Sequence, residues 1–306
     1  MKLDFLIPAS PTDGFFSQIA FFKLCLNALG SHYESARLVA VFGDHQTETI
    51  PQEWRAYFDA IEVEWAHLPG AVNEDHRAQH DRRFEVIRSH ADIAILCDAD
   101  IAVLRPFDSL LDQLIDKPAL AGVIAHYHFP WPPRVRDPDR QWSALANAVI
   151  GKDVARPHRY TLMKPERAQA TPFYINYGML AAPPALFEEF YPRDLQLRPK
   201  IAQFLGHWWA PQVSVPLTCA DLDLPTRALP MRYNFPNDPI ADRLHSEELE
   251  RIVFLHYLRT NRFDRAKVFA SESHFNAFLT ADLKHSNECF REHVLVLTGG
   301  RFPFSR

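Results

Sequence analysis

Short, largely apolar runs recur through the first 125 residues, and they restrict the fold more than any other feature of the chain. The runs lie at 3–7, 38–42, 93–97 and 119–125. A strand with one face in water alternates apolar and polar residues, whereas a continuous apolar run is typical of a strand covered on both faces. We therefore predict that these runs form strands in the interior of one sheet.

The segments between the runs predict helices. Apolar residues recur at helical spacing from Phe15 to Leu29, and Gly30 is a suitable helix stop. Further helices are expected over 51–60 and 76–90, with a short strand over 61–63 between them. Alternating strands and helices indicate an α/β fold with a mostly parallel central sheet and flanking helices.

The second half is less regular. Residues 126–172 are rich in proline, arginine and aromatic residues, and we predict an irregular excursion from the sheet. A strand over 173–182, helices over 184–191 and 199–207, and a late strand over 252–255 follow. With no internal repeat and no low-complexity linker, the sequence predicts one domain, 1–306, with an elaborated second half.

Composition narrows the class of protein and its location. The formal charge is −5, without the basic excess expected of a nucleic-acid binder. No apolar run reaches the ~18 residues of a membrane span, and the N-terminus lacks a signal-peptide core. The four cysteines lie far apart, which favours neither a disulfide framework nor a zinc-thiolate site. We predict a cytoplasmic protein without a transmembrane segment.

A pair of carboxylates carries the strongest chemical signal. The apolar run Ile93–Cys97 leads directly into Asp98-Ala99-Asp100. In open α/β sheets, ligands bind outside the carboxyl ends of the strands. Two carboxylates there form a hard oxygen site for Mn²⁺ or Mg²⁺, and such an ion neutralises the charge of a departing diphosphate.

The same pattern also occurs at 137–139 and 221–223, where no buried strand precedes it and solvated turn acids are the better interpretation. The chain has only ten glycines and neither of the common glycine-rich phosphate loops. A cation held by Asp98 and Asp100, helped by basic side chains, is the remaining way to hold a diphosphate.

Several motifs then resemble, in order, those of glycosyltransferases with the GT-A fold, in the style of the glycogenin and bacterial lipopolysaccharide galactosyltransferase group. The segment 94–100, followed by Leu104-Arg-Pro-Phe107, is similar to the metal-binding segment of that group. The segments 176–180, 229–234 and 252–257 are similar to its N-x-G strand, its L-P-x-x-x-N segment and its late strand, whose histidine completes the metal site. Together these motifs span nearly the whole chain.

The resemblance implies a hexosyltransferase-like enzyme that moves a sugar from a nucleotide-diphosphate sugar, with UDP and retention of configuration favoured, to a carbohydrate or glycoconjugate acceptor. It implies a nucleotide-binding half, 1–125, and an acceptor-side and metal-completing half, 126–306. The implied metal ligands are Asp98, Asp100 and His256, with Mn²⁺ or Mg²⁺ as cofactor. The implied catalytic residues are Asn176 and Gln212, and the implied donor-binding residues are Pro8, Ala9, Ser10, Asp44, Arg83, Asp98, Ala99, Asp100, Asn176, Gly178 and Lys267.

The chain also departs from the group. Pro211 precedes Gln212 where the group has an aspartate, which leaves the catalytic assignment open. The basic run after His256, which is Arg259, Arg262, Arg265 and Lys267, does not match the group's H-x-x-G-x-x-K-P pattern. The span 126–172 is longer than usual and is the expected acceptor side. Four tryptophans either stack on an acceptor sugar or anchor the core, namely Trp131, Trp142, Trp208 and Trp209.

Two other functions stay open at this stage. A sugar-phosphate nucleotidyltransferase needs a glycine-rich, basic turn after the first strand, whereas residues 8–14 contain one glycine and no Arg or Lys. A non-catalytic nucleotide-sugar or carbohydrate-binding module fits the missing acid before Gln212, but not the intact Asp98 and Asp100. The alternating pair His126 and His128 is a further metal-site candidate, for which packing or solvent exposure is the simpler interpretation.

Overall fold

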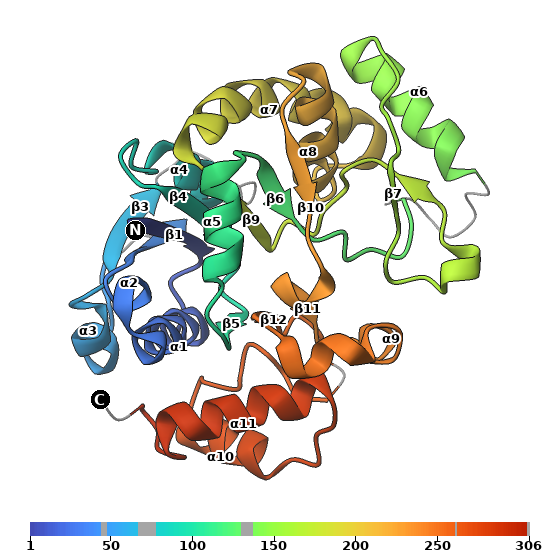
Figure 1. Ribbon diagram of the computed structural model, residues 1–306. Helices are drawn as coiled ribbons and strands as arrows, with labels where there is room; N and C mark the ends of the chain where they lie inside the picture. The colour runs from blue at the N-terminus through green and yellow to red at the C-terminus, as the bar shows by residue number, and fades with distance from the viewer. Residues whose placement is uncertain (44–47, 67–77, 130–136, 261, 305–306) are drawn as a thin grey trace.

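A seven-stranded sheet forms the centre of the molecule (Figure 1). The computed structural model describes residues 1–43, 48–66, 78–129, 137–260 and 262–304. The strand order is β10-β6-β9-β4-β1-β2-β3. These strands are β1 (Leu3–Ala9), β2 (Arg37–Gly43), β3 (Glu62–Ala66), β4 (Ile93–Cys97), β6 (Leu120–Gly122), β9 (Met179–Ala182) and β10 (Thr226–Ala228).

The neighbours β4-β1-β2-β3 are parallel, as are β10 and β6. Strand β9 runs antiparallel to both β4 and β6. The mostly parallel sheet predicted from the apolar runs is therefore confirmed, with one reversed strand inside it.

Helices cover both faces of this sheet and extend beyond it (Figure 1). They are α1 (Asp13–Leu29), α2 (Ser31–Glu34), α3 (Gln52–Phe58), α4 (Ala78–Glu85), α5 (Asp108–Asp116), α6 (Pro138–Ile150), α7 (Pro184–Leu205), α8 (Ala210–Asp221), α9 (Pro239–Leu244), α10 (Glu272–Thr280) and α11 (Ser286–Thr298). Helix α1 ends at Gly30, whose φ of 64° suits glycine, as its sequence predicts.

The alternation of side chains along β1 divides the core into two layers. Phe5 and Ile7 belong to one apolar cluster, which also takes in α1, α5 and the C-terminal helices. Leu6 points to the other face and joins a cluster with α4, α7 and α8. Both faces of the strand are dry, which explains why its sequence is almost continuously apolar.

A small second sheet, with the order β11-β12-β5, joins the segment after β4 to strands from the second half of the chain. Its strands are β5 (Ile101–Val103), β11 (Phe235–Pro236) and β12 (Phe254–His256). Strand β12 runs antiparallel to β5, with His256 opposite Ile101. A late strand is therefore fixed beside the segment that directly follows β4.

Several predicted boundaries are wrong. The helix expected over 76–90 ends at Glu85, because the Arg88 backbone N–H instead donates to Asp4 Oδ2 at 3.0 Å. The strand expected over 173–182 begins only at Met179. The strand expected over 119–125 is limited to Leu120–Gly122.

Helix α7 replaces the two helices predicted over 184–191 and 199–207. It continues through Pro192 and Pro199, although each proline removes a backbone donor. Its buried side chains, Phe190 and Leu197 among them, pack against the neighbouring elements and compensate for these losses.

The described parts of the segment 126–172 hold more regular structure than its composition indicates. It contains the 13-residue helix α6 and a short hairpin of β7 (His158–Arg159) and β8 (Ala170–Thr171). Trp142 on α6 is fully buried and donates from Nε1 to Tyr160 Oη at 2.9 Å. A stacking role for Trp142 at an acceptor is therefore wrong, because its ring faces a core cluster shared by α6, α7 and α8. Trp131 lies outside the described residues.

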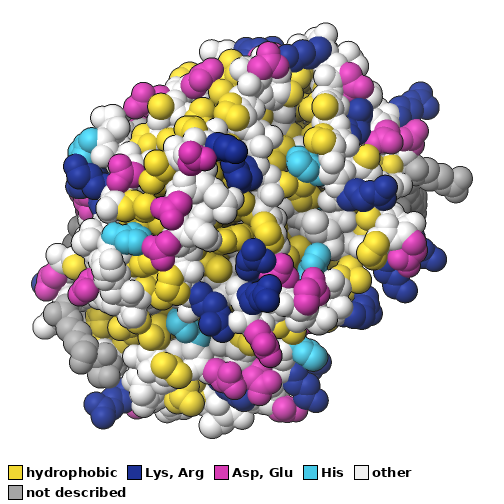
Figure 2. Space-filling view, viewed as in Figure 1, with side chains coloured by type: hydrophobic (Ala, Val, Ile, Leu, Met, Phe, Trp, Pro, Cys, Tyr) yellow, Lys and Arg dark blue, Asp and Glu magenta, His cyan; other side chains and the backbone are white. Residues whose placement is uncertain are grey.

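Acidic and basic side chains are interspersed on the face drawn in Figure 2. The formal charge of −5 agrees with this mixture, which differs from the continuous basic surface that a nucleic-acid backbone attracts. Within the described ranges, no helix combines the length and apolar character needed to cross a bilayer.

We predict that Trp142→Ala lowers the free energy of unfolding by about 3–5 kcal/mol, because it leaves a large cavity in the core. Trp208→Ala, at a side chain that is 79% exposed, is the matched control and should stay within about 0.5 kcal/mol. Urea denaturation of both variants measures the difference. Equal stability of the two variants would show that the cluster around α6 contributes little.

Candidate active site

A cavity of about 1810 Å³ lies where β1 and β4 end at the carboxyl edge of the sheet. Both halves of the chain contribute to its wall. Most of the residues that the sequence singles out line it, namely Pro8, Ala9, Ser10, Asp98, Ala99, Asp100, Asn176, Gly178, Gln212 and His256.

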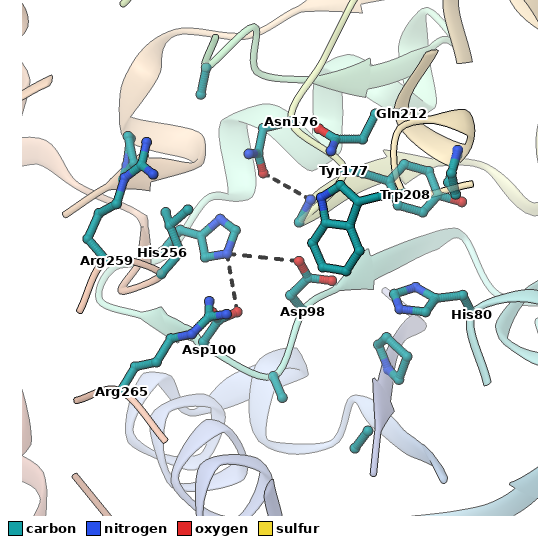
Figure 3. Close-up of a pocket in the computed structure, with 18 of the residues that line it drawn as sticks. His80, Asp98, Asp100, Asn176, Tyr177, Trp208, Gln212, His256, Arg259 and Arg265 are labelled. Carbon is teal, nitrogen blue, oxygen red and sulfur yellow. Dashed lines mark hydrogen bonds and ion pairs between the residues drawn. The ribbon is translucent and has the colours of Figure 1, made fainter. Parts of the chain in front are cut away.

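Asp98, Asp100 and His256 form a compact cluster in this cavity (Figure 3). One ligand atom from each lies within 4.8 Å of the others. His256 Nε2 is 3.2 Å from Asp100 Oδ1 and 3.9 Å from Asp98 Oδ2. The cluster follows from the topology, because the two aspartates occupy the short connection from β4 to β5 and β12 pairs with β5.

The chemistry of this cluster fits a divalent cation. Burial and the neighbouring Asp100 carboxylate raise the pKa of Asp98, so a positive charge here would stabilise its ionised form. Burial opposes ionisation of Asp100 as well, yet His256 in its protonated form and Arg265 outweigh it and hold the pKa of Asp100 below its usual value. Two carboxylates and one imidazole nitrogen are ligands that Mn²⁺ accepts, and the carboxylates also suit Mg²⁺.

Two asparagine side chains lie on the other side of His256, and one of them, Asn234, contacts its ring. His256 Nδ1 lies 3.1 Å from Asn234 Oδ1. Asn234 Nδ2 donates to Asn176 Oδ1 at 3.1 Å, and the Gly178 backbone N–H donates to the same oxygen at 3.0 Å. The oxygen of Asn176 is thus already engaged within the protein, which leaves its amide nitrogen for other contacts.

The basic side chain of Arg265 reaches the cluster. Its guanidinium donates to Asp100 Oδ2, and its backbone carbonyl accepts from Gln18 Nε2 at 3.1 Å. Lys267, the residue chosen from the sequence, is exposed, pairs with Asp264 at 3.1 Å and is not part of the cavity wall. The local turn at 264–267 directs Arg265 inward and Lys267 outward, a detail that the spacing of the basic run does not reveal.

Arg83 lies behind the cavity instead of lining it. Its side chain is fully buried, donates to the Cys97 carbonyl at 3.3 Å and lies 5.6 Å from the Tyr177 ring centroid. Tyr177 does line the cavity, and its hydroxyl accepts from Arg198 Nη2 at 3.3 Å. Arg198 also lines the cavity, and sequence reasoning missed it because its approach requires α7 to continue through Pro192.

Two side chains near the start of α8 project toward the cavity. Gln212 lies in the first turn of α8, and its Oε1 is buried without a hydrogen-bond partner among the described residues. Trp208 lines the cavity while remaining 79% exposed, and its side chain is drawn with the other residues of the cavity wall in Figure 3.

Three further residues that the sequence singles out are Asp44, Asp137 and His126. Asp44 lies outside the described residues. Asp137 caps α6 by accepting from the Arg140 backbone N–H at 3.0 Å, in line with a turn acid. His126 stacks on Tyr174 with ring centroids 4.0 Å apart, so packing explains it.

Comparisons with known proteins support the fold. No protein-family model matches the chain, and no curated protein does. The glycosyltransferase GlyE of Streptococcus pneumoniae TIGR4 is similar over 100% of this chain and 66% of its own, with a TM-score of 0.50 and 15% identity. The bifunctional glycosyltransferase WbbM is similar over 85% of this chain and 46% of its own, with a TM-score of 0.50 and 10% identity.

The galactosyltransferase LgtC, solved with donor and acceptor sugar analogues, is similar over 85% of this chain and 88% of its own, with a TM-score of 0.46 and 14% identity. The predicted GT-A fold is thus confirmed. At these identities the likeness establishes the fold, and the activity is a question for the chemistry of the site.

We predict that Arg265→Gln raises the affinity for Mn²⁺ in the absence of nucleotide roughly twofold to fivefold. The substitution removes a positive charge beside Asp100, and the Arg265 side chain is 41% exposed, so the effect is modest. Electron paramagnetic resonance of free Mn²⁺ measures it, with Arg262→Gln, at an exposed arginine nearby, as the control. An unchanged or lower affinity in Arg265→Gln would contradict the competition between Arg265 and the cation.

Proposed function

We propose that this chain is a metal-dependent glycosyltransferase that moves a sugar from a nucleotide-diphosphate sugar, with UDP favoured, to a carbohydrate or glycoconjugate acceptor. The observation that supports this function most strongly is the cluster of Asp98, Asp100 and His256, which lies in a large cavity at the carboxyl end of β4. The resemblance of the ordered motifs to GT-A transferases and the shared fold support the same activity.

The donor is proposed to lie along the carboxyl edge of the sheet. Pro8, Ala9 and Ser10 hold the nucleoside at the end of β1. Mn²⁺ or Mg²⁺, when bound by Asp98, Asp100 and His256, supplies positive charge to the diphosphate. Arg265 adds a second positive charge on the same side of the cavity, where a diphosphate can replace Asp100 as its partner.

The sugar is proposed to rest between Asn176, Gly178 and Gln212. The amide nitrogen of Asn176 donates to a sugar hydroxyl, since its oxygen is engaged by Gly178 and Asn234. Gln212 lines the same cavity and is proposed to lie on the sugar side of it. In a retaining transfer, the anomeric C–O bond to the diphosphate breaks and a bond to the acceptor oxygen forms on the same face. The acceptor proton leaves with the nucleoside diphosphate, so the missing acid at position 211 is not required as a base.

The acceptor is proposed to enter from the second half of the chain, where Trp208 offers an exposed indole face. Aromatic faces stack on the apolar face of a pyranose ring. This proposal makes 1–306 one catalytic domain, with 1–125 on the nucleotide side and 126–306 on the acceptor side.

A non-catalytic binding module is the second candidate, because Pro211 replaces an acid that the resembled group carries. The intact Asp98 and Asp100, which lie with His256 in the cavity, favour catalysis over binding alone. The rival nucleotidyltransferase is less well supported, because residues 8–14 bring no basic side chain to the end of β1.

We predict that UDP binding depends on the cation. In calorimetry with Mn²⁺ present, the affinity for UDP should fall at least about 10-fold, or 1.4 kcal/mol, when excess chelator is added. Asp100→Asn should produce a similar loss without chelator, because it removes a charged ligand. An affinity for UDP that is the same with chelator as with Mn²⁺ would contradict the proposed cation site.

We also predict a separate role for Trp208. Trp208→Ala should raise the acceptor KM roughly 2- to 10-fold, which corresponds to the loss of about 0.5–1.5 kcal/mol from one stacking face, and Trp208→Phe should restore most of the affinity. Donor hydrolysis should change little, because the donor is held by the cation cluster. Lost donor hydrolysis with an unchanged acceptor KM would place Trp208 on the donor side instead.

A further inference from the structure

The hydrogen bonds around His256 form a continuous relay that starts at the backbone of Gly178. The Gly178 N–H donates to Asn176 Oδ1 at 3.0 Å, and Asn234 Nδ2 approaches the same oxygen at 3.1 Å. Asn234 Oδ1 then lies 3.1 Å from His256 Nδ1. Three separate segments meet here, namely the turn before β9, the residue after 231–233 and the end of β12.

The direction of every hydrogen bond in this relay is determined by its first member. A backbone N–H can only donate, so the atom of Asn176 that faces Gly178 is its oxygen. Asn234 must present its amide nitrogen to that oxygen, which turns its own oxygen toward His256. An amide oxygen can only accept, and therefore His256 Nδ1 carries a proton.

On its other side, His256 faces Asp100, which favours a proton on Nε2 instead of Nδ1. Asp100 Oδ1 lies 3.2 Å from His256 Nε2, and a carboxylate favours a proton on the nitrogen that it faces. A neutral imidazole with that proton has no lone pair on Nε2 and cannot bind a cation there. Asn234 is 1% exposed and His256 is 4% exposed, so bulk water does not readily replace the relay.

We infer that Asn234 is a positioning residue, which acts with Asn176 and Gly178 to hold His256 as the Nδ1–H tautomer and leave Nε2 free for a divalent cation. This inference rests on the cation site of the proposed function. It also assigns the N-x-G segment a structural task in that site, beyond any contact with the donor sugar.

Glycine at position 178 is required by the same arrangement. A Cβ added there would lie 2.3 Å from His256 Cε1 and 2.8 Å from Nδ1. The imidazole ring therefore packs directly over the Gly178 backbone, which fixes its plane while the relay fixes its proton. Glycine is required here because the His256 ring lies so close to the backbone, and not because of a left-handed conformation, since φ at Gly178 is not positive.

The tautomer can be observed directly by ¹⁵N NMR of histidine-labelled protein, without metal and at a pH where the imidazole is neutral. His256→Gln identifies the His256 signal among those of the 15 histidines. We expect the Nδ1–H pattern in the wild type and the Nε2–H pattern in Asn234→Leu, which removes the acceptor at similar volume. Asn234→Asp keeps an acceptor facing Nδ1 and should restore the Nδ1–H pattern.

Mn²⁺ affinity is the second measurement on the same proteins. It should fall roughly 10- to 100-fold in Asn234→Leu, the range for loss of a partner of a metal-bound histidine, and recover in Asn234→Asp. A folded Asn234→Leu protein with wild-type tautomer and affinity would overturn the relay. So would the Nε2–H pattern in the wild type.

The two proposals fail in different ways. A wild-type protein with the Nδ1–H pattern that switches in Asn234→Leu, but with no Mn²⁺ binding at millimolar concentration, would support the relay and overturn the cation site. If Asn234→Leu does not fold, the ¹⁵N spectrum of the Asn234→Asp protein still tests the relay. Loss of the Nδ1–H pattern in that variant would overturn it.

Discussion

The antiparallel pairing of β5 with β12 is the contact on which the rest of the site depends. It brings His256 beside Asp100, although the two residues are 156 positions apart in the chain. Strand β5 directly follows the Asp98-Ala99-Asp100 connection, so the small sheet and the main sheet share one cluster of charged side chains. A displacement of β12 by one residue would turn its side chains to the opposite face and remove His256 from the cluster.

This pairing also explains why the site combines rigidity with accessibility. The aspartates leave β4 at the edge of a sheet that is packed on both faces, so their backbone is fixed by two apolar layers. Further bonds hold the connection, since the Tyr257 backbone N–H donates to the Asp100 carbonyl at 3.0 Å and the Asp98 N–H donates to the Gly178 carbonyl at 2.9 Å. The carboxylates themselves face the cavity, where a charged ligand can reach them.

Local patterns in the sequence predict the parts of this structure that depend on local forces. The apolar runs identify β1, β2 and β4 because those strands are dry on both faces, and the Asp98 and Asp100 pair follows one of them. His256 could be placed only through the resemblance of ordered motifs, since nothing near it in sequence indicates its distant partner. The inward turn of Arg265, the approach of Arg198 and the burial of Trp142 all depend on packing between remote segments, which composition and periodicity do not encode. The single helix α7 in place of two predicted helices has the same cause, because its tertiary packing outweighs the local cost of Pro192.

The most direct test of the central claim is to incubate the protein with a panel of nucleotide-diphosphate sugars and to follow the products by ³¹P and ¹H NMR, with and without Mn²⁺. We expect slow, Mn²⁺-dependent release of a nucleoside diphosphate and a free sugar from one donor, with loss of this activity in Asp98→Asn. The first-formed sugar should have the anomeric configuration of the donor. Formation of a sugar phosphate and a nucleotide by pyrophosphate chemistry, or tight binding without any turnover across the panel, would contradict the assignment of this chain as a glycosyltransferase.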